Sequence, residues 1–196
     1  MNNKKRIGLI VSVIALVTLA TAGVTFAYLS STTATITNTF TAGDVQISLA
    51  ESNFVQEDAH VLVPGASFDK NPTVTVLANS ENCWVAVKVT VPKALDTLVT
   101  LDWNTTNWQL VKKITDPDNS TNYAYFYKYQ GEVSKAATAT QLAAVFNHVS
   151  VNTADTNAQL QGLTANDLKI GVQAYAIQSL SFADQATALA QWIPAD

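Results

Sequence analysis

The sequence predicts a mainly β protein, an antiparallel β-sandwich of the jelly-roll or immunoglobulin kind with one or two short helices. Apolar and β-branched residues alternate with polar ones, which is the period of a half-buried strand. Turn-forming residues interrupt these runs about every ten residues, as in all-β domains. Two stretches of the chain, both rich in Ala, Leu and Gln, are typical of helices instead.

The first alternating run lies at residues 32–41. Ala34, Ile36 and Phe40 share one side of it, and threonines occupy the other side. The run is therefore predicted to be a strand with one apolar and one hydroxylated edge. Turn residues follow at 42–44 and end this strand.

Residues 82–91 form the clearest core strand, because one cysteine and four valines alternate there with other residues. Val87 is predicted to face the core, and Lys88 to face outward. The preceding run at 73–78 is predicted to be the partner of this strand in a hairpin. Pro92 lacks a backbone donor and should end the strand.

The remaining elements follow from the same patterns. Alternation within 123–129 places four tyrosines on one side, which predicts a half-exposed strand. Pro64-Gly65 predicts a turn. The other predicted strands are 45–49, 98–103, 108–112, 145–151 and 168–178, with the tyrosine strand extending over 123–130. Helices are predicted at 135–144 and 183–192.

Composition limits the possible functions. The chain has 196 residues, of which 48% are hydrophobic and 13% charged, which is enough apolar material for one buried core. Three of its 11 basic residues are Lys4, Lys5 and Arg6, which leaves 8 basic against 15 acidic residues after position 6. No basic patch remains, so no nucleic-acid partner is expected. Cys83 is the only cysteine, so no disulfide can form within one chain.

The first 27 residues have the three-part layout of a secretory signal. Basic residues at 4–6 precede an uncharged, mainly apolar run at 7–22, and small residues stand at Thr25 and Ala27. Cleavage is therefore expected between Ala27 and Tyr28. The alternative is a permanent membrane anchor, but the apolar run is short for a bilayer span and contains hydroxyl residues. Only the precursor, before its signal is removed, is expected to be held in the membrane.

These patterns divide the chain into three parts. Residues 1–27 are predicted to be a cleaved signal peptide, residues 28–43 an N-terminal strand and turn, and residues 44–196 the β-sandwich domain. The product is expected to be secreted.

Motifs of catalysis are missing from the sequence. His60 and His148 are the only histidines, and neither stands in the helical two-histidine pattern of a zinc protease. Glu57 and His60, three residues apart, are the one pair that could share a metal. Cys83 lies among valines and is predicted to be an inert buried thiol. The acidic run at 116–120 lacks the glycine and glutamate of a calcium loop, so it is interpreted as a turn. We therefore expect no catalytic residue, no metal, no cofactor and no enzyme activity.

Three segments carry a family resemblance. The segments are Ala22-Gly23-Val24-Thr25-Phe26-Ala27-Tyr28 with Phe40-Thr41-Ala42-Gly43-Asp44; Val63-Pro64-Gly65 with Asn82-Cys83-Trp84-Val85-Ala86-Val87; and Val172-Gln173-Ala174-Tyr175-Ala176 with the Ala-rich stretch to Trp192. Together they resemble the TasA/camelysin family of exported proteins. The resemblance implies a β-sandwich and removal of the signal by a dedicated signal peptidase of the SipW type. Members best known for function are subunits of extracellular biofilm or pilus-like fibres, while others carry a metalloprotease label.

The expected function is that of a secreted structural subunit that polymerises with copies of itself in the extracellular matrix or at the cell surface. Each molecule would donate its strand at 32–40 into a groove between the sheets of the next, with Ala34, Ile36 and Phe40 filling pockets. Other matrix or anchoring proteins are further expected partners. Two alternatives remain open: a camelysin-type surface metalloprotease, and a minor accessory or anchoring protein of another fibre.

Overall fold

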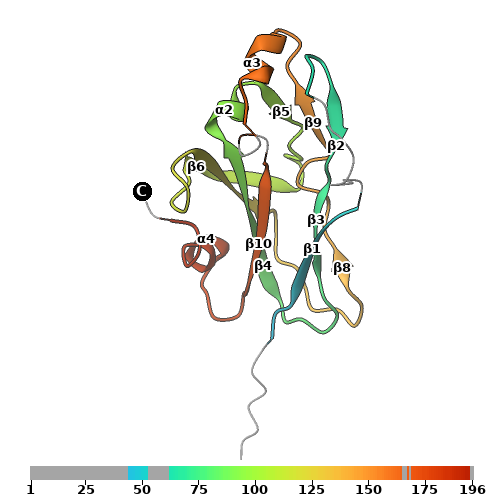
Figure 1. Cartoon of the computed structure of the whole chain (residues 1–196). Helices are drawn as coiled ribbons and strands as arrows, with labels where there is room; N and C mark the ends of the chain where they lie inside the picture. Colours follow the sequence, from blue (N-terminus) through green and yellow to red (C-terminus); the bar gives the residue numbers. More distant parts are fainter. Residues whose placement is uncertain (1–43, 53–61, 165–166, 168, 195–196) are drawn as a thin grey trace, which may run out of the picture. The chain divides into compact units, whose positions relative to one another are not determined.

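Strands dominate the computed structural model of this protein, which describes residues 44–52, 62–164, 167 and 169–194 (Figure 1). These residues belong to one compact unit, Ala42–Asp196. The signal peptide, the strand at 32–41 and the Glu57–His60 pair lie outside the described residues. The strands are β1 (Ile47–Glu51), β2 (Ser67–Asp69), β3 (Pro72–Val76), β4 (Cys83–Pro92), β5 (Val99–Leu101), β6 (Trp108–Thr115), β7 (Asn122–Tyr129), β8 (Thr140–Gln141), β9 (His148–Val151) and β10 (Gly171–Gln178). The helices are α2 (Lys93–Asp96), α3 (Asn157–Gln161) and α4 (Gln185–Leu189).

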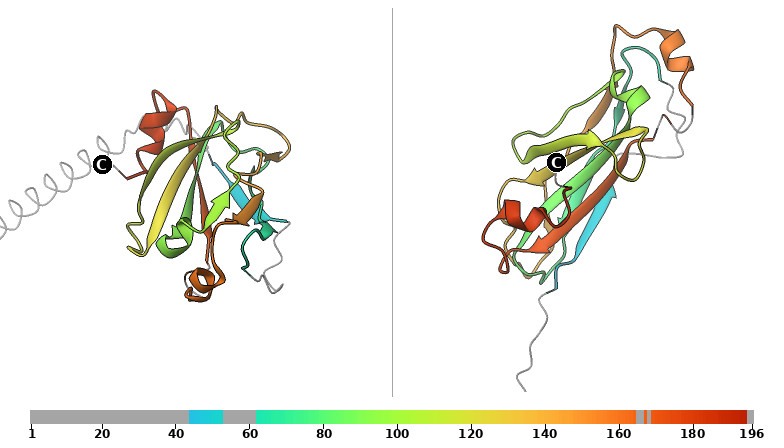
Figure 2. Two further views of the ribbon diagram at one scale, coloured as in Figure 1. Left: turned by 90° about the horizontal axis from the view of Figure 1, so that it is seen from above. Right: turned by 90° about the vertical axis from the view of Figure 1, so that its left-hand side faces the viewer.

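The strands form two layers. One layer is an antiparallel four-stranded sheet with the order β10-β4-β7-β6. The other contains two three-stranded sheets, β1-β3-β8 and β2-β9-β5, which lie end to end in Figures 1 and 2. Lys70 and Asn71 alone separate β2 from β3, and the Lys70 amide donates to the carbonyl of Asn147 at 2.8 Å. The predicted mainly β sandwich with few short helices is therefore confirmed.

The main core lies between the two layers, and β4 supplies its centre. Cys83, Val85, Val87, Val89 and Val91 are all 0% exposed, as the alternation in the sequence predicted. They pack with buried residues of the opposite layer: Val74, Val76, Val99, Leu101, Val149 and Val151. Burial of each such side chain contributes about 1.5–3 kcal/mol to folding.

A second, smaller core lies on the outer face of the four-stranded sheet, beneath α4. Ala86, Phe126 and Leu189 are buried in it. The ring of Trp192 stacks on Tyr175 with centroids 5.0 Å apart. Asp184 caps α4 by accepting from the amide of Thr187 at 2.8 Å. The predicted helix at 183–192 is therefore confirmed as a shorter element.

Contacts with distant parts of the chain change two predictions about the four-stranded sheet. Lys88 was predicted to face outward into water, and its side chain does lie on the outer side of β4, yet the residue is 8% exposed. The tyrosine strand was predicted to be half-exposed, but Tyr127 is 4% exposed in the main core and Phe126 is 2% exposed beneath α4. The prediction for Lys88 was wrong because the carboxylates of the β6–β7 turn cover its side chain. The tyrosine strand is half-buried at Tyr123, Tyr125 and Tyr129 as predicted, and it departs from the prediction only at Tyr127, covered in the main core, and Phe126, covered by α4.

The predicted hairpin of 73–78 with 82–91 is also wrong. β3 pairs with β1 and β8, whereas β4 pairs with β10 and β7. The intervening turn carries the chain from one layer to the other, with Asn79 in the left-handed region at φ 63°. Pro64-Gly65 forms a turn as predicted, with Gly65 at φ 80°.

The predicted helix at 135–144 does not form. The segment contains β8 and loops, and the carbonyl of Ala136 accepts from the Asn79 amide at 2.8 Å. Leu142 and Val145 are buried in the main core. Pairing with the β3 layer therefore outweighs the intrinsic helix propensity of this Ala-rich segment. The short elements α2, α3, β2 and β8 were not predicted.

Candidate functional site

The residues predicted to act in cleavage and assembly lie outside the described part of the chain. These are Ala27, Tyr28, Ala34, Ile36 and Phe40. The described residues instead include the surface that a donated strand would need, at the side of the sandwich where β1 and β10 lie next to each other (Figures 1 and 2).

The outer edge of β10 carries unused backbone hydrogen-bonding capacity. β10 pairs with β4 on one side, and no described strand pairs with its other side. The Ser179 amide donates to the carbonyl of Asn82 at 2.8 Å. Because hydrogen-bonded pairs alternate along an antiparallel ladder, the backbones of Val172, Ala174 and Ala176 point away from β4. This edge can accept another strand.

β1 presents a matching edge. It pairs with β3, and no ladder among the described strands joins it to β10. The Leu77 amide donates to the carbonyl of Gln46 at 2.8 Å, so the backbones of Ile47 and Leu49 point away from β3 by the same alternation.

The side chains along these two edges are apolar and partly covered. Val172, Ala174 and Ala176 pack against the main core without being fully buried, and so do Ile47 and Leu49. By contrast, the β4 valines opposite the three β10 residues are 0% exposed. The sandwich is therefore incompletely covered at its β1–β10 side, where partly exposed apolar side chains lie along two neighbouring strand edges that no ladder joins.

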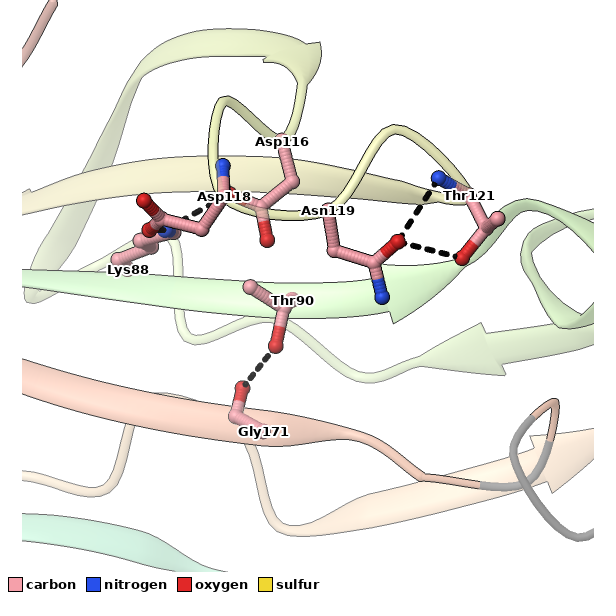
Figure 3. A network of polar contacts seen from close by, with 7 residues as sticks. All are labelled: Lys88, Thr90, Asp116, Asp118, Asn119, Thr121 and Gly171. Atoms are coloured by element: carbon pink, nitrogen blue, oxygen red, sulfur yellow. Dashed lines mark hydrogen bonds and ion pairs between the residues drawn. The ribbon is translucent and has the colours of Figure 1, made fainter.

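A separate polar cluster lies on the outer face of the four-stranded sheet, away from the main core (Figure 3). The Lys88 ammonium lies 2.7 Å from a carboxylate oxygen of Asp116 and 2.7 Å from one of Asp118. Burial alone would lower the pKa of Lys88, but the hydrogen bonds and charges of both aspartates outweigh it and raise the pKa above 10.5. Asp116 is 4% exposed. The acidic run at 116–120 is thus the β6–β7 turn, as predicted, and its carboxylates hold a lysine.

Figure 3 also shows how closely β10 approaches β4 at its first residue. The Thr90 hydroxyl donates to the carbonyl of Gly171 at 3.4 Å. A Cβ atom at position 171 would lie 2.6 Å from that hydroxyl oxygen. Any larger residue at the start of β10 would therefore require the Thr90 side chain to move.

Cys83 is the inert buried thiol that its pattern predicted. The residue is 0% exposed, and burial together with the charge of Glu132 raises the pKa of its thiol to about 11. A thiol of this kind is a poor nucleophile at neutral pH.

His148 lies between two carboxylates at the start of β9. Its Nδ1 is 2.9 Å from Oδ2 of Asp102, and its Nε2 is 3.3 Å from Oδ1 of Asp69. The hydrogen bond with Asp102 and the charges of both aspartates raise the pKa of His148 above 6.5. No group of three or more His, Cys, Asp or Glu side chains placed to hold a metal occurs within the described residues.

The stability of the protein should therefore contain a term that depends on the charge of His148. Since the folded pKa lies above the unfolded one, this term is fully present below about pH 6.5 and is lost as the pH rises through the folded pKa. Urea unfolding between pH 5.5 and 8.5 should show this decline in the wild type, and the decline should vanish in His148→Gln. An NMR titration, with His60→Gln to assign the signals, checks the direction of the shift. A pKa at or below 6.5 for His148 would contradict this account.

The described residues thus define a class: a mainly β sandwich domain with an apolar, unpaired β1–β10 side. No family model matches the chain, and no curated protein or solved structure matches it. Within the described ranges, none of the helices has the length and hydropathy needed to cross a membrane.

Proposed function

We propose that the mature protein is a secreted structural subunit that self-assembles into extracellular biofilm-matrix or pilus-like fibres. In this proposal a SipW-type signal peptidase cuts between Ala27 and Tyr28, and each subunit then donates residues 32–40 to the next subunit. The protein is not an enzyme in this proposal. Its partners are copies of itself and other matrix or anchoring proteins.

The observation that carries the proposal is the unpaired β1–β10 side of the sandwich. An added strand could form backbone hydrogen bonds with the outward groups of Val172, Ala174 and Ala176, which would extend the four-stranded sheet. β10 has 8 residues, and the donor segment at 32–40 has a similar length. The two can therefore pair over nearly their whole extent.

The side chains of the two strands also match in size. Ala174 and Ala176 are small residues on the inward side of an edge strand. Ile36 and Phe40 are large apolar residues on one side of the donor strand. Placing them over the partly covered core would remove apolar surface of both subunits from water, worth about 1.5–3 kcal/mol for each fully buried side chain. The threonines of the donor strand would remain near water.

This arrangement produces an open-ended polymer. The donor strand and the accepting edge are different surfaces of the same chain, so the contact is heterologous. A heterologous contact whose rotation does not close a ring generates a filament.

The proposal predicts opposite results for two pairs of substitutions in protein that begins at Tyr28. Replacing Ile36 and Phe40 together by Asp should abolish filaments, because each charge would enter an apolar surface at a cost of several kcal/mol. Replacing Thr35 and Thr39 by Asp should preserve filaments, because these side chains remain near water. Negative-stain electron microscopy detects the filaments, and circular dichroism on the same samples verifies that both variants are folded.

Deletion of residues 28–40 separates assembly from folding. The shortened protein should be folded and monomeric. Regular filaments from this variant would show that another edge connects the subunits. An unfolded product would show that the segment completes its own sandwich, which would favour the accessory-protein alternative.

The accessory alternative also has a direct test. A fibre subunit assembles when purified alone, whereas a protein that caps or anchors another fibre does not. Wild-type protein that stays monomeric at high concentration, yet binds a preformed fibre of the matrix, would replace the self-assembly proposal.

A further inference from the structure

The end of the sandwich where β1 begins carries two exposed leucines. Leu180 is 94% exposed and Leu77 is 36% exposed. Leu77 lies in the β3–β4 turn, and Leu180 lies in the loop between β10 and α4. Figure 1 shows both loops at the end of the domain where β1 begins.

Hydrogen bonds connect these loops to the start of the described domain. The Glu81 amide donates to the carbonyl of Asp44 at 3.0 Å, and the carbonyl of the next residue, Asn82, accepts from the Ser179 amide at 2.8 Å. Asp44, just before β1, and Ser179, just before Leu180, therefore bind neighbouring residues of the β3–β4 turn.

The position of Leu180 is fixed although its side chain is exposed. Its neighbour Ser179 is 8% exposed. The Ser179 hydroxyl donates to the carbonyl of Asn82 at 3.2 Å and contacts the carboxylate of Glu132. The Phe182 amide donates back to the Ser179 carbonyl at 3.1 Å. A leucine held in this way is presented to solvent at a defined place.

Chain length places the neighbouring subunit close to this end. Three residues separate Phe40 from Asp44, so their Cα atoms can be at most about 14 Å apart. If residues 32–40 are paired with the next subunit, that subunit must lie within this reach of Asp44. Leu77 and Leu180, at the same end of the domain as Asp44, would then lie close to that subunit.

We infer that Leu180, supported by Leu77, forms a second contact with the subunit that accepts the donor strand, which is another copy of this chain. This inference rests on the proposed function and adds to it a contact outside the donor strand. Burial of an exposed leucine in that contact would favour assembly and would fix the angle between successive subunits.

Substitution of Leu180 tests the inference. Leu180→Glu should raise the critical concentration for filament formation at least about tenfold, with the melting temperature unchanged, because the side chain makes little contact within its own subunit. Leu180→Met should assemble like the wild type. Leu110→Glu, at a 46% exposed position on β6, is the matched control and should also leave assembly unchanged.

A fluorescent label provides a direct readout of burial. Cys83 is fully buried, so an environment-sensitive dye reacts selectively with Leu180→Cys, or with Leu110→Cys as control. In filaments that contain a small fraction of labelled subunits, emission should shift to shorter wavelength for position 180 and not for position 110.

The outcomes separate the inference from the proposal on which it rests. Filaments of Leu180→Glu at the wild-type critical concentration, or no emission shift at position 180, would overturn the inference while the donor-strand proposal stands. Wild-type protein that forms no filaments would overturn both.

Discussion

Val87→Asp is expected to destabilise the protein severely and to remove a large part of its total stability. Val87 is 0% exposed at the centre of the main core, opposite Ala174 on β10 and Tyr127 on β7. The substitution removes an apolar side chain and introduces a charge with no partner, so the loss should exceed about 4 kcal/mol. A domain of this size has a total stability of about 5–15 kcal/mol. Denaturant unfolding followed by circular dichroism measures the loss.

Two control variants separate the effect of the charge from that of the position. Val87→Ala should lose about 2 kcal/mol, since it removes two methyl groups from the core without adding a charge. Gln109→Asp, at an exposed position of β6 opposite Lys128, should change stability by less than about 0.5 kcal/mol. Equal losses at positions 87 and 109 would contradict the assignment of the core face.

Lys88→Met is expected to cost about 3–5 kcal/mol, although the residue belongs to the outer side of β4. The substitution leaves the carboxylate of Asp116, which is 4% exposed, without its buried cation. Asp118→Asn should cost less than about 1 kcal/mol, because the side chain of Asp118 is 83% exposed. The free energy of unfolding at pH 7 measures both effects.

A double-mutant cycle isolates the Lys88–Asp116 interaction. Lys88→Met combined with Asp116→Asn should recover part of the loss, because neither charge is then buried alone. Gln173→Ala, at the exposed position opposite Lys88 on β10, is a neutral control. A loss for Lys88→Met as small as that for Asp118→Asn would show that the pair is open to water in solution.

Alternation along the chain was sufficient to predict the main core. In β4, the parity of Cys83 and the valines follows from the period of an extended strand, a local property. The sequence likewise predicted the turn at 116–120 and a helix near the C-terminus, because turn residues and runs of helix-forming Ala, Leu and Gln act over a few positions. The capping box of α3, in which Thr156 and Gln159 bond each other's backbone amides, was a missed signal of the same local kind.

The candidate site could be predicted in part. Ala34, Ile36 and Phe40 were chosen from local alternation, but the sequence did not indicate which edge could accept them. The β1–β10 side joins strands at least 120 positions apart in the chain. The small size of Ala174 and Ala176 indicates room for large donated side chains only once β10 is known to be an edge strand.

The sequence by itself determined the elements whose signals are short in range: the longer strands, the core-facing side of β4, and the turns at 64–65 and 116–120. The tertiary structure alone decided which strands pair, which faces are covered and which edges stay open. Lys88 illustrates the reason, since its burial depends on Asp116 from the β6–β7 turn. The β3–β4 connection is a second case, because the choice between a hairpin and a crossing between layers depends on the packing of the whole sandwich. Such contacts between distant segments leave no periodic trace in the chain.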